Sequence, residues 1–123
     1  MGLIELTLHK VIKVWFIQYT KKIRTGFLFT NKSFLILSEN MKLSLDDLFD
    51  WSEKNQTLYF IEMLYASYLN YCQSIYKQPD FNKQELSLAF AILSEDEKKK
   101  VFNTWGNADN FGLEKSKKKA MKK

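Results

Sequence analysis

Alternating apolar and polar residues from position 3 to position 8 form the first clear pattern in this chain. An alternation of period two is typical of a half-buried β-strand. A second run over 11–17 is rich in β-branched and aromatic residues, which favour strands. A three-residue loop over 9–11 makes one hairpin face wholly apolar, whereas a two-residue loop would put Lys13 beside Leu6 on that face. We therefore predict a hairpin closed by the longer loop.

Two further apolar runs, 27–30 and 33–37, are separated by an Asn-Lys pair. Asparagine tolerates positive φ, so this pair can close a second hairpin with Phe29 opposite Phe34. Both faces of that hairpin would be apolar, which requires burial on two sides or contact with a partner. A helical conformation over 34–40 is the alternative.

The second half of the chain shows helical periodicity, and each expected helix begins at a capping residue. The longest helix, over about 57–77, is apolar nearly all round, with a narrow polar stripe through Glu62, Asn70 and Gln73. Such a helix is expected at the centre of the domain. Pro79 ends it, and Gly106 ends the last helix. The expected caps are Ser44 with Asp47, Asn55 or Thr57, Asn82 with Glu85, and Ser94 with Glu97.

These elements predict a small α+β protein in which N-terminal antiparallel hairpins pack on a four-helix C-terminal half. The 123 residues suit one domain, which we place at 1–106, followed by a flexible Lys-rich tail at 107–123. A single cysteine excludes an internal disulfide and fits a reducing cytosol. We find no secretion signal and no apolar run of the ~20 residues that a membrane span needs, so we expect a cytoplasmic location and no membrane contact.

Candidate catalytic and metal-binding residues are few. With one histidine, His9, and one cysteine, Cys72, the chain has no cluster of nitrogen and sulfur ligands for a metal. Asp46, Asp47 and Asp50 are the densest carboxylates, and the start of a helix favours acids through its dipole. There is no Gly-rich phosphate loop and no base placed beside a nucleophile. We therefore expect no enzyme activity, no cofactor and no metal.

The net charge of +5 is unevenly spread, because basic residues predominate over 1–43 and over 112–123, whereas acidic residues predominate between them. Basic and aromatic residues alternate around the predicted sheet, a composition that suits contact with a protein partner or with a nucleic-acid backbone and its bases. The candidate binding residues are Lys10, Lys13, Tyr19, Lys21, Lys22, Arg24, Phe29 and Lys32.

Several segments together resemble tail assembly chaperones of long-tailed bacteriophages. The likeness lies in the opening strands over 3–8 and 11–14, in the helical stretches 43–48, 65–72 and 79–81, and in the Lys-rich end. The chain departs from these proteins at His9-Lys10, where they tend to have Asn-Gly, and over 24–40, which has no counterpart. The resemblance implies a non-catalytic phage protein in the host cytosol, which coats the helical tape measure protein until the tail tube replaces it.

A second class of phage protein matches the same composition. Small, basic proteins with aromatic-rich cores also act as inhibitors of host defence, and one anti-CRISPR-like form blocks an RNA-guided nuclease at its nucleic-acid channel or guide. On this alternative the basic residues of the sheet contact the effector protein or its RNA. The identity of the partner does not follow from the sequence.

Overall fold

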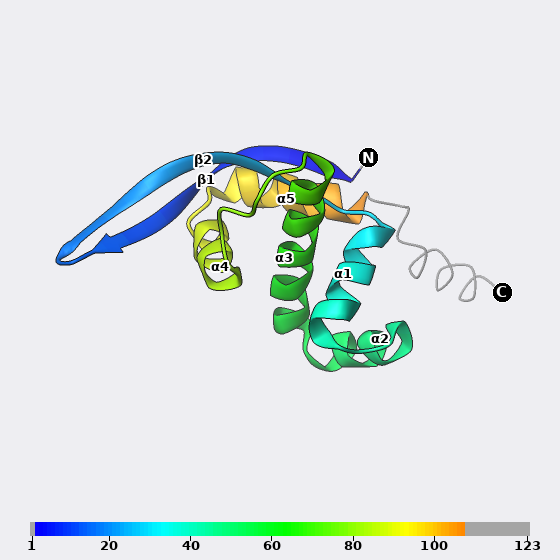
Figure 1. Ribbon diagram of the computed structural model, residues 1–123. Helices are drawn as coiled ribbons and strands as arrows, with labels where there is room; N and C mark the ends of the chain where they lie inside the picture. The colour runs from blue at the N-terminus through cyan, green and yellow to red at the C-terminus, as the bar shows by residue number, and fades with distance from the viewer. Residues whose placement is uncertain (1, 108–123) are drawn as a thin grey trace.

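The structure is a computed structural model that describes residues 2–107. Over these residues it is an α+β fold in which one long antiparallel hairpin precedes five helices (Figure 1), so the predicted fold class is confirmed. Except for Asn107, the predicted tail lies outside the described residues. The elements are β1 (Leu3–Val14), β2 (Ile17–Leu28), α1 (Asn31–Met41), α2 (Leu45–Lys54), α3 (Gln56–Ser74), α4 (Lys83–Ala91) and α5 (Glu95–Gly106).

The first predicted hairpin has the wrong turn. Residues 9–11 continue β1, and the chain reverses at Trp15 and Phe16 instead. Leu8 therefore pairs with Ile23 and not with a residue of the predicted second strand. The polar and basic segment 18–25 belongs to β2, because a strand needs only a backbone ladder and solvent accommodates its polar side chains.

The second predicted hairpin is also wrong, since its second apolar run forms α1. Thr30 is the N-cap, and its hydroxyl accepts a hydrogen bond from the backbone N–H of Lys32, 3.3 Å away. The Ser33 hydroxyl accepts in return from the N–H of Thr30, which completes a capping box. The helical alternative for 34–40 is therefore the correct one, because local capping and the covering of one helix face favour it.

The long helix α3 runs down the middle of the helical part, beneath the base of the hairpin and between α1 and α4 (Figure 1). Its predicted polar stripe is wrong at Asn70, which is buried. The Asn70 amide donates to the carbonyl oxygen of Leu28 at 2.8 Å and to the Thr30 hydroxyl at 2.9 Å. These bonds fasten α3 to the junction of β2 and α1, so a polar side chain here contributes to the core.

The predicted caps at Ser44, Asn82 and Ser94 are confirmed, because each side chain accepts the expected backbone hydrogen bond. Asn55 occupies the N-cap position of α3 but makes no side-chain capping bond there. Among the described residues, no helix combines the length and apolar character needed to cross a membrane.

The loop after α3 is held by Tyr68, whose ring is fully buried. Its hydroxyl oxygen accepts hydrogen bonds from the N–H groups of Asp80 at 2.6 Å and Phe81 at 3.1 Å. Burial raises the pKa of Tyr68 far above its usual value, with smaller opposing contributions from these bonds. The loop is thereby fixed where it leads into α4.

Candidate partner-binding arm

The hairpin has a buried base and a projecting outer part. At the base, Leu6 and Leu8 are buried. The described helices pack against this part of the hairpin, on one side of it (Figure 1). Beyond the Leu8–Ile23 pair the two strands extend away from the body, and we call residues 9–22 the arm. Lys10 anchors its inner end, since its ammonium donates to the Asp80 carbonyl oxygen at 2.6 Å and lies 3.5 Å from a Glu85 carboxylate oxygen.

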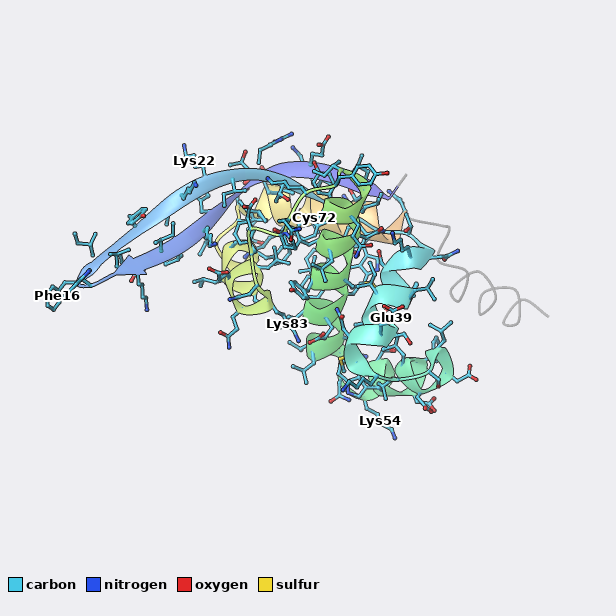
Figure 2. All side chains as sticks on the ribbon, viewed as in Figure 1. Phe16, Lys22, Glu39, Lys54, Cys72 and Lys83 are labelled. Carbon is cyan, nitrogen blue, oxygen red and sulfur yellow. The ribbon has the colours of Figure 1, made fainter. Side chains whose placement is uncertain are left out.

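The arm ends in two exposed aromatic residues. Trp15 and Phe16 form the turn and are 92% and 100% exposed, and Figure 2 shows Phe16 at the end of the arm. Trp15 has a φ of 58°, a conformation that a side chain disfavours by roughly 1–2 kcal/mol and that glycine or asparagine normally provides in such turns. The turn residues are thus poorly suited to turn formation, and their large apolar surfaces are presented to solvent.

The strand register gives the arm two chemically different sides. Side chains alternate across a strand, and directly paired residues share a side. One side continues the core face of the base, and we call it the underside. It begins with Lys10 and Lys21 and is apolar farther out, where its residues are Ile12, Val14, Ile17 and Tyr19. The opposite outer side is mainly polar or basic: His9, Val11, Lys13, Gln18, Thr20 and Lys22.

The arm is also positively charged. No acidic residue occurs between Glu5 and Glu39 in the sequence, and Lys13, Lys21 and Lys22 are exposed. Like charges close together raise the local potential and attract an anionic surface. The arm therefore combines apolar side chains with a basic field.

The structure brings most of the predicted binding residues together. Five lie on the arm, and Arg24 is exposed just inside it. Phe29 is fully buried and stacks on Trp105 with 5.5 Å between ring centroids, so it presents no binding surface. Lys32 lies in the first turn of α1, outside the sheet. The five arm residues are Lys10, Lys13, Tyr19, Lys21 and Lys22.

Sequence reasoning missed the exposure of Trp15 and Phe16, because it placed them inside a strand. A signal was present in the segment 18–25, where Tyr19, Ile23 and three threonine or glutamine residues have strand-compatible composition. Treating that segment as a strand moves the turn outward to Trp15 and Phe16. The aromatic pair would then have been expected at the tip.

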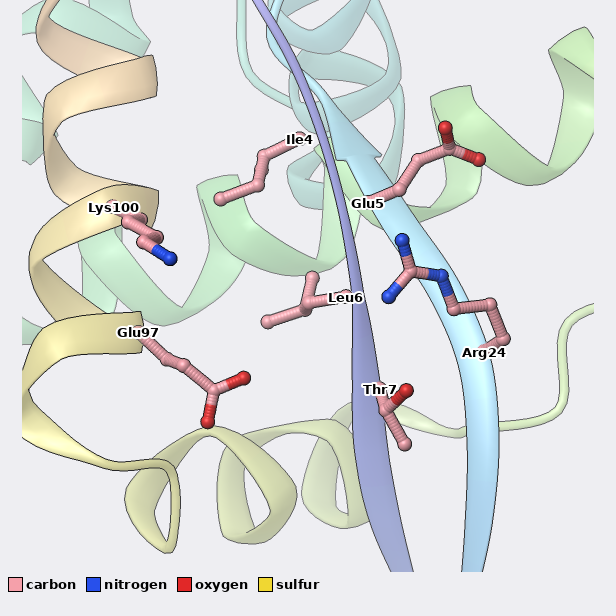
Figure 3. A pocket seen from close by; sticks show the side chains of 7 residues that line it. All are labelled: Ile4, Glu5, Leu6, Thr7, Arg24, Glu97 and Lys100. Atoms are coloured by element: carbon pink, nitrogen blue, oxygen red, sulfur yellow. The ribbon is translucent and has the colours of Figure 1, made fainter.

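A pocket beside the base of the hairpin is a weaker candidate. Figure 3 shows Ile4 and Leu6 extending toward α5, while Glu5 and Arg24 lie on the other side of the strand, so its polar groups do not converge. Glu5 accepts a hydrogen bond from the Tyr71 hydroxyl at 2.8 Å, which raises the pKa of Tyr71. The lining residues are Ile4, Glu5, Leu6, Thr7, Arg24, Glu97 and Lys100.

Within residues 2–107, no group of three or more His, Cys, Asp and Glu side chains is placed to hold a metal ion. Cys72 is buried in α3, and burial raises the pKa of its thiol. A raised pKa keeps the sulfur protonated and reduces its nucleophilicity at neutral pH.

Comparisons with protein-family models, with curated proteins and with solved structures find no match for this chain.

Proposed function

We propose that this chain is a non-catalytic binding protein, a tail assembly chaperone-like adaptor whose arm holds a long, helical, tape-measure-like protein. The observation that supports this function is the pair of exposed aromatic side chains at the tip of a projecting hairpin. Covering a large apolar side chain contributes roughly 1.5–3 kcal/mol, so a partner that buries Trp15 and Phe16 gains substantial affinity. Tryptophan is also among the residues that most often dominate binding energy at interfaces.

The arm suits a protein partner because it reaches beyond the body that supports it. Its base is buried and its inner end is tied to Asp80 and Glu85 through Lys10. A binding surface held by a packed scaffold loses less conformational freedom on association than a loose segment does. Several copies along one long helix can then each contribute an arm.

Co-expression tests the adaptor function. The chain is produced with the long helical protein encoded nearest to its gene, and light scattering gives the mass of the purified complex. We expect a soluble complex with several copies of this chain per partner. The variant Trp15→Ser with Phe16→Ser should lose the complex, whereas Leu35→Ser, which changes a side chain 54% exposed on α1, should retain it. A partner that stays insoluble, or a complex that survives loss of the tip, would contradict this function.

A second candidate is an anti-CRISPR-like inhibitor that contacts an RNA-guided nuclease or its RNA. The basic outer side of the arm favours this function, since Lys13 and Lys22 lie there with exposed Arg24 close to its inner end. Cations next to an aromatic ring are a common arrangement for binding single-stranded nucleic acid, and Lys21 lies on the same side of the arm as Tyr19.

Salt dependence separates the two candidates. Each phosphate neutralised contributes a slope of about −0.7 in log K against log salt for single strands, so Lys13, Lys21, Lys22 and Arg24 together give at most about −3. Fluorescence anisotropy with a short labelled RNA measures this slope, and changing Lys21, Lys22 and Arg24 to alanine should flatten it without altering the melting temperature. Failure to bind RNA at low salt would remove direct RNA contact and leave a protein partner.

A further inference from the structure

Helix α4 presents an exposed apolar strip next to the arm. Its inner residues, including Leu86 and Phe90, are buried, whereas Leu88 is 47% exposed and Ile92, directly after the helix, is 50% exposed. Residues three and four apart share a helix face, so Leu88 and Ile92 lie on the same face as Glu85. Since Glu85 contacts Lys10 at the root of the arm, this strip begins where the arm leaves the body.

The arm underside and this strip meet at the Lys10–Glu85 contact. Ile12 is two residues farther along β1 than Lys10, a distance of about 7 Å. Leu88 is three residues beyond Glu85, a rise of about 4.5 Å along the helix. An α-helix with side chains is about 10 Å wide, so one added helix can contact both surfaces. We call the surface formed by Ile12, Tyr19, Leu88 and Ile92 the corner.

Charge defines what kind of helix the corner accepts. Lys21 borders it on the arm, and Lys13 and Lys22 lie on the adjoining outer side. Of the acidic residues near the corner, Glu85 is paired with Lys10, Asp80 with Lys77 and Glu95 with Lys98. Asp96 is exposed beyond Ile92, so the basic field lies on the arm side of the corner. A helix with an apolar stripe flanked by Asp or Glu therefore fits, whereas Lys-flanked helices are repelled.

The acidic helix of a second copy fits less well. Helix α2 has Asp46 and Asp47 in its first turn, but its Leu48 is buried and its Trp51 packs against the core of its own chain. Its remaining exposed large apolar residue is Leu45, which is too little to cover the corner. A helix from another protein, with its own unburied apolar stripe, is required.

We infer that the corner is the binding site for an amphipathic helix with acidic flanks, and that this helix lies beneath the arm and against α4. This inference rests on the proposed function, since it specifies how a helical partner is held. The tip residues Trp15 and Phe16 then close over the outer end of that helix. The mode is that of a helix in a groove, where apolar side chains provide affinity and flanking charges select orientation.

A designed peptide tests the corner without knowledge of the natural partner. The probe is a labelled helix of about three heptads with Leu at its two core positions and Glu at both flanks, where like charges limit self-association. Fluorescence anisotropy should show binding that weakens with salt, and a matched peptide with Lys flanks should not bind. Tyr19→Ser and Leu88→Ser should each weaken binding by about tenfold, because each removes partly exposed apolar surface from the contact.

The matched control is Leu35→Ser, a comparably exposed leucine on α1, which should leave peptide affinity unchanged. All three variants should melt within a few degrees of the parent, because about half of each residue is already exposed to solvent. Equal effects of Leu35→Ser and Leu88→Ser, equal binding of both peptides, or self-association of this chain through Tyr19 and Leu88 would each overturn the inference.

The outcome is separable from that of the proposed function. If the natural helical partner co-purifies and depends on Trp15 and Phe16, but is insensitive to Leu88→Ser, the corner is wrong and the adaptor function stands. If no helical partner co-purifies and the acidic peptide does not bind, both are overturned.

Discussion

The base and the arm belong to the same pair of strands but differ in what covers them. At the base, Leu6, Leu8 and Phe27 are buried beneath the helices, whereas on the arm Ile17 and Tyr19 stand in solvent. The side-chain alternation is the same in both regions. The difference teaches that an apolar strand face indicates a surface for which burial is favourable. It does not indicate whether residues of the same chain bury that surface.

Polar groups differ between the two regions in the same way. Around the base, Asn70, Ser67 and Ser33 form a connected set of hydrogen bonds, and each buried side-chain polar atom of the described residues has a partner. On the arm, Lys13, Lys21 and Lys22 are exposed. The base is therefore fixed by paired polar groups and packing, while the charged groups of the arm are exposed to solvent.

Truncating one phenylalanine in each region should give the largest contrast. Phe29→Ala should lower the free energy of unfolding by about 3–5 kcal/mol, because it empties a site in the core beside Trp105. Phe16→Ala should change it by less than about 0.5 kcal/mol, because that ring is fully exposed. Denaturant unfolding measures both, and similar losses would show that the arm is part of the folded core.

Removing the buried amide should have a smaller effect. Asn70→Ala should lower the free energy of unfolding by about 1–3 kcal/mol, since it leaves the hydroxyl of Thr30 without the amide donor. Gln73→Ala, an exposed change on the same helix, is the matched control and should be nearly neutral. If the two variants have the same free energy of unfolding, the hydrogen bonds of the Asn70 side chain do not fasten α3 to the hairpin base.

Alkaline pH should weaken the body through Tyr68. The folded-state pKa is raised above the unfolded value of 10.0, so the unfolded chain loses this proton first. Stability is then fully present below about pH 10 and falls as the pH rises further. Thermal melts from pH 8 to 11 test this, and Tyr68→Phe should have a shallower decline there. An equal decline in both proteins would assign the effect to other groups.

The smallest expected effect has the opposite sign. Trp15→Gly should leave stability unchanged or raise it by up to about 1 kcal/mol, because glycine adopts positive φ without a side-chain clash. Partner binding should fall in the same variant. A loss of stability would mean that the Trp15 side chain supports the hairpin itself, and retained binding would remove it from the interface.

Local chemistry made the helix starts predictable. Ser44, Asn82 and Ser94 each accept a hydrogen bond from a backbone N–H three residues away, and both partners of such a bond lie within one short stretch of sequence. The same logic applied at Thr30 would have identified α1, but the adjoining Asn-Lys pair also fits a turn. Two local patterns competed there, and burial of Phe34 and Leu37 on one side of a helix decided between them.

The sequence by itself determined the α+β class, the central helix, three of the caps and the basic character of the N-terminal region. Only the tertiary structure decided the length of the hairpin, the burial of Phe29 and Asn70, and the exposure of Trp15 and Phe16. The physical reason is range. Caps and periodicity act over a few residues, whereas strand register and burial depend on contacts between segments far apart in the chain, such as Leu28 with Asn70.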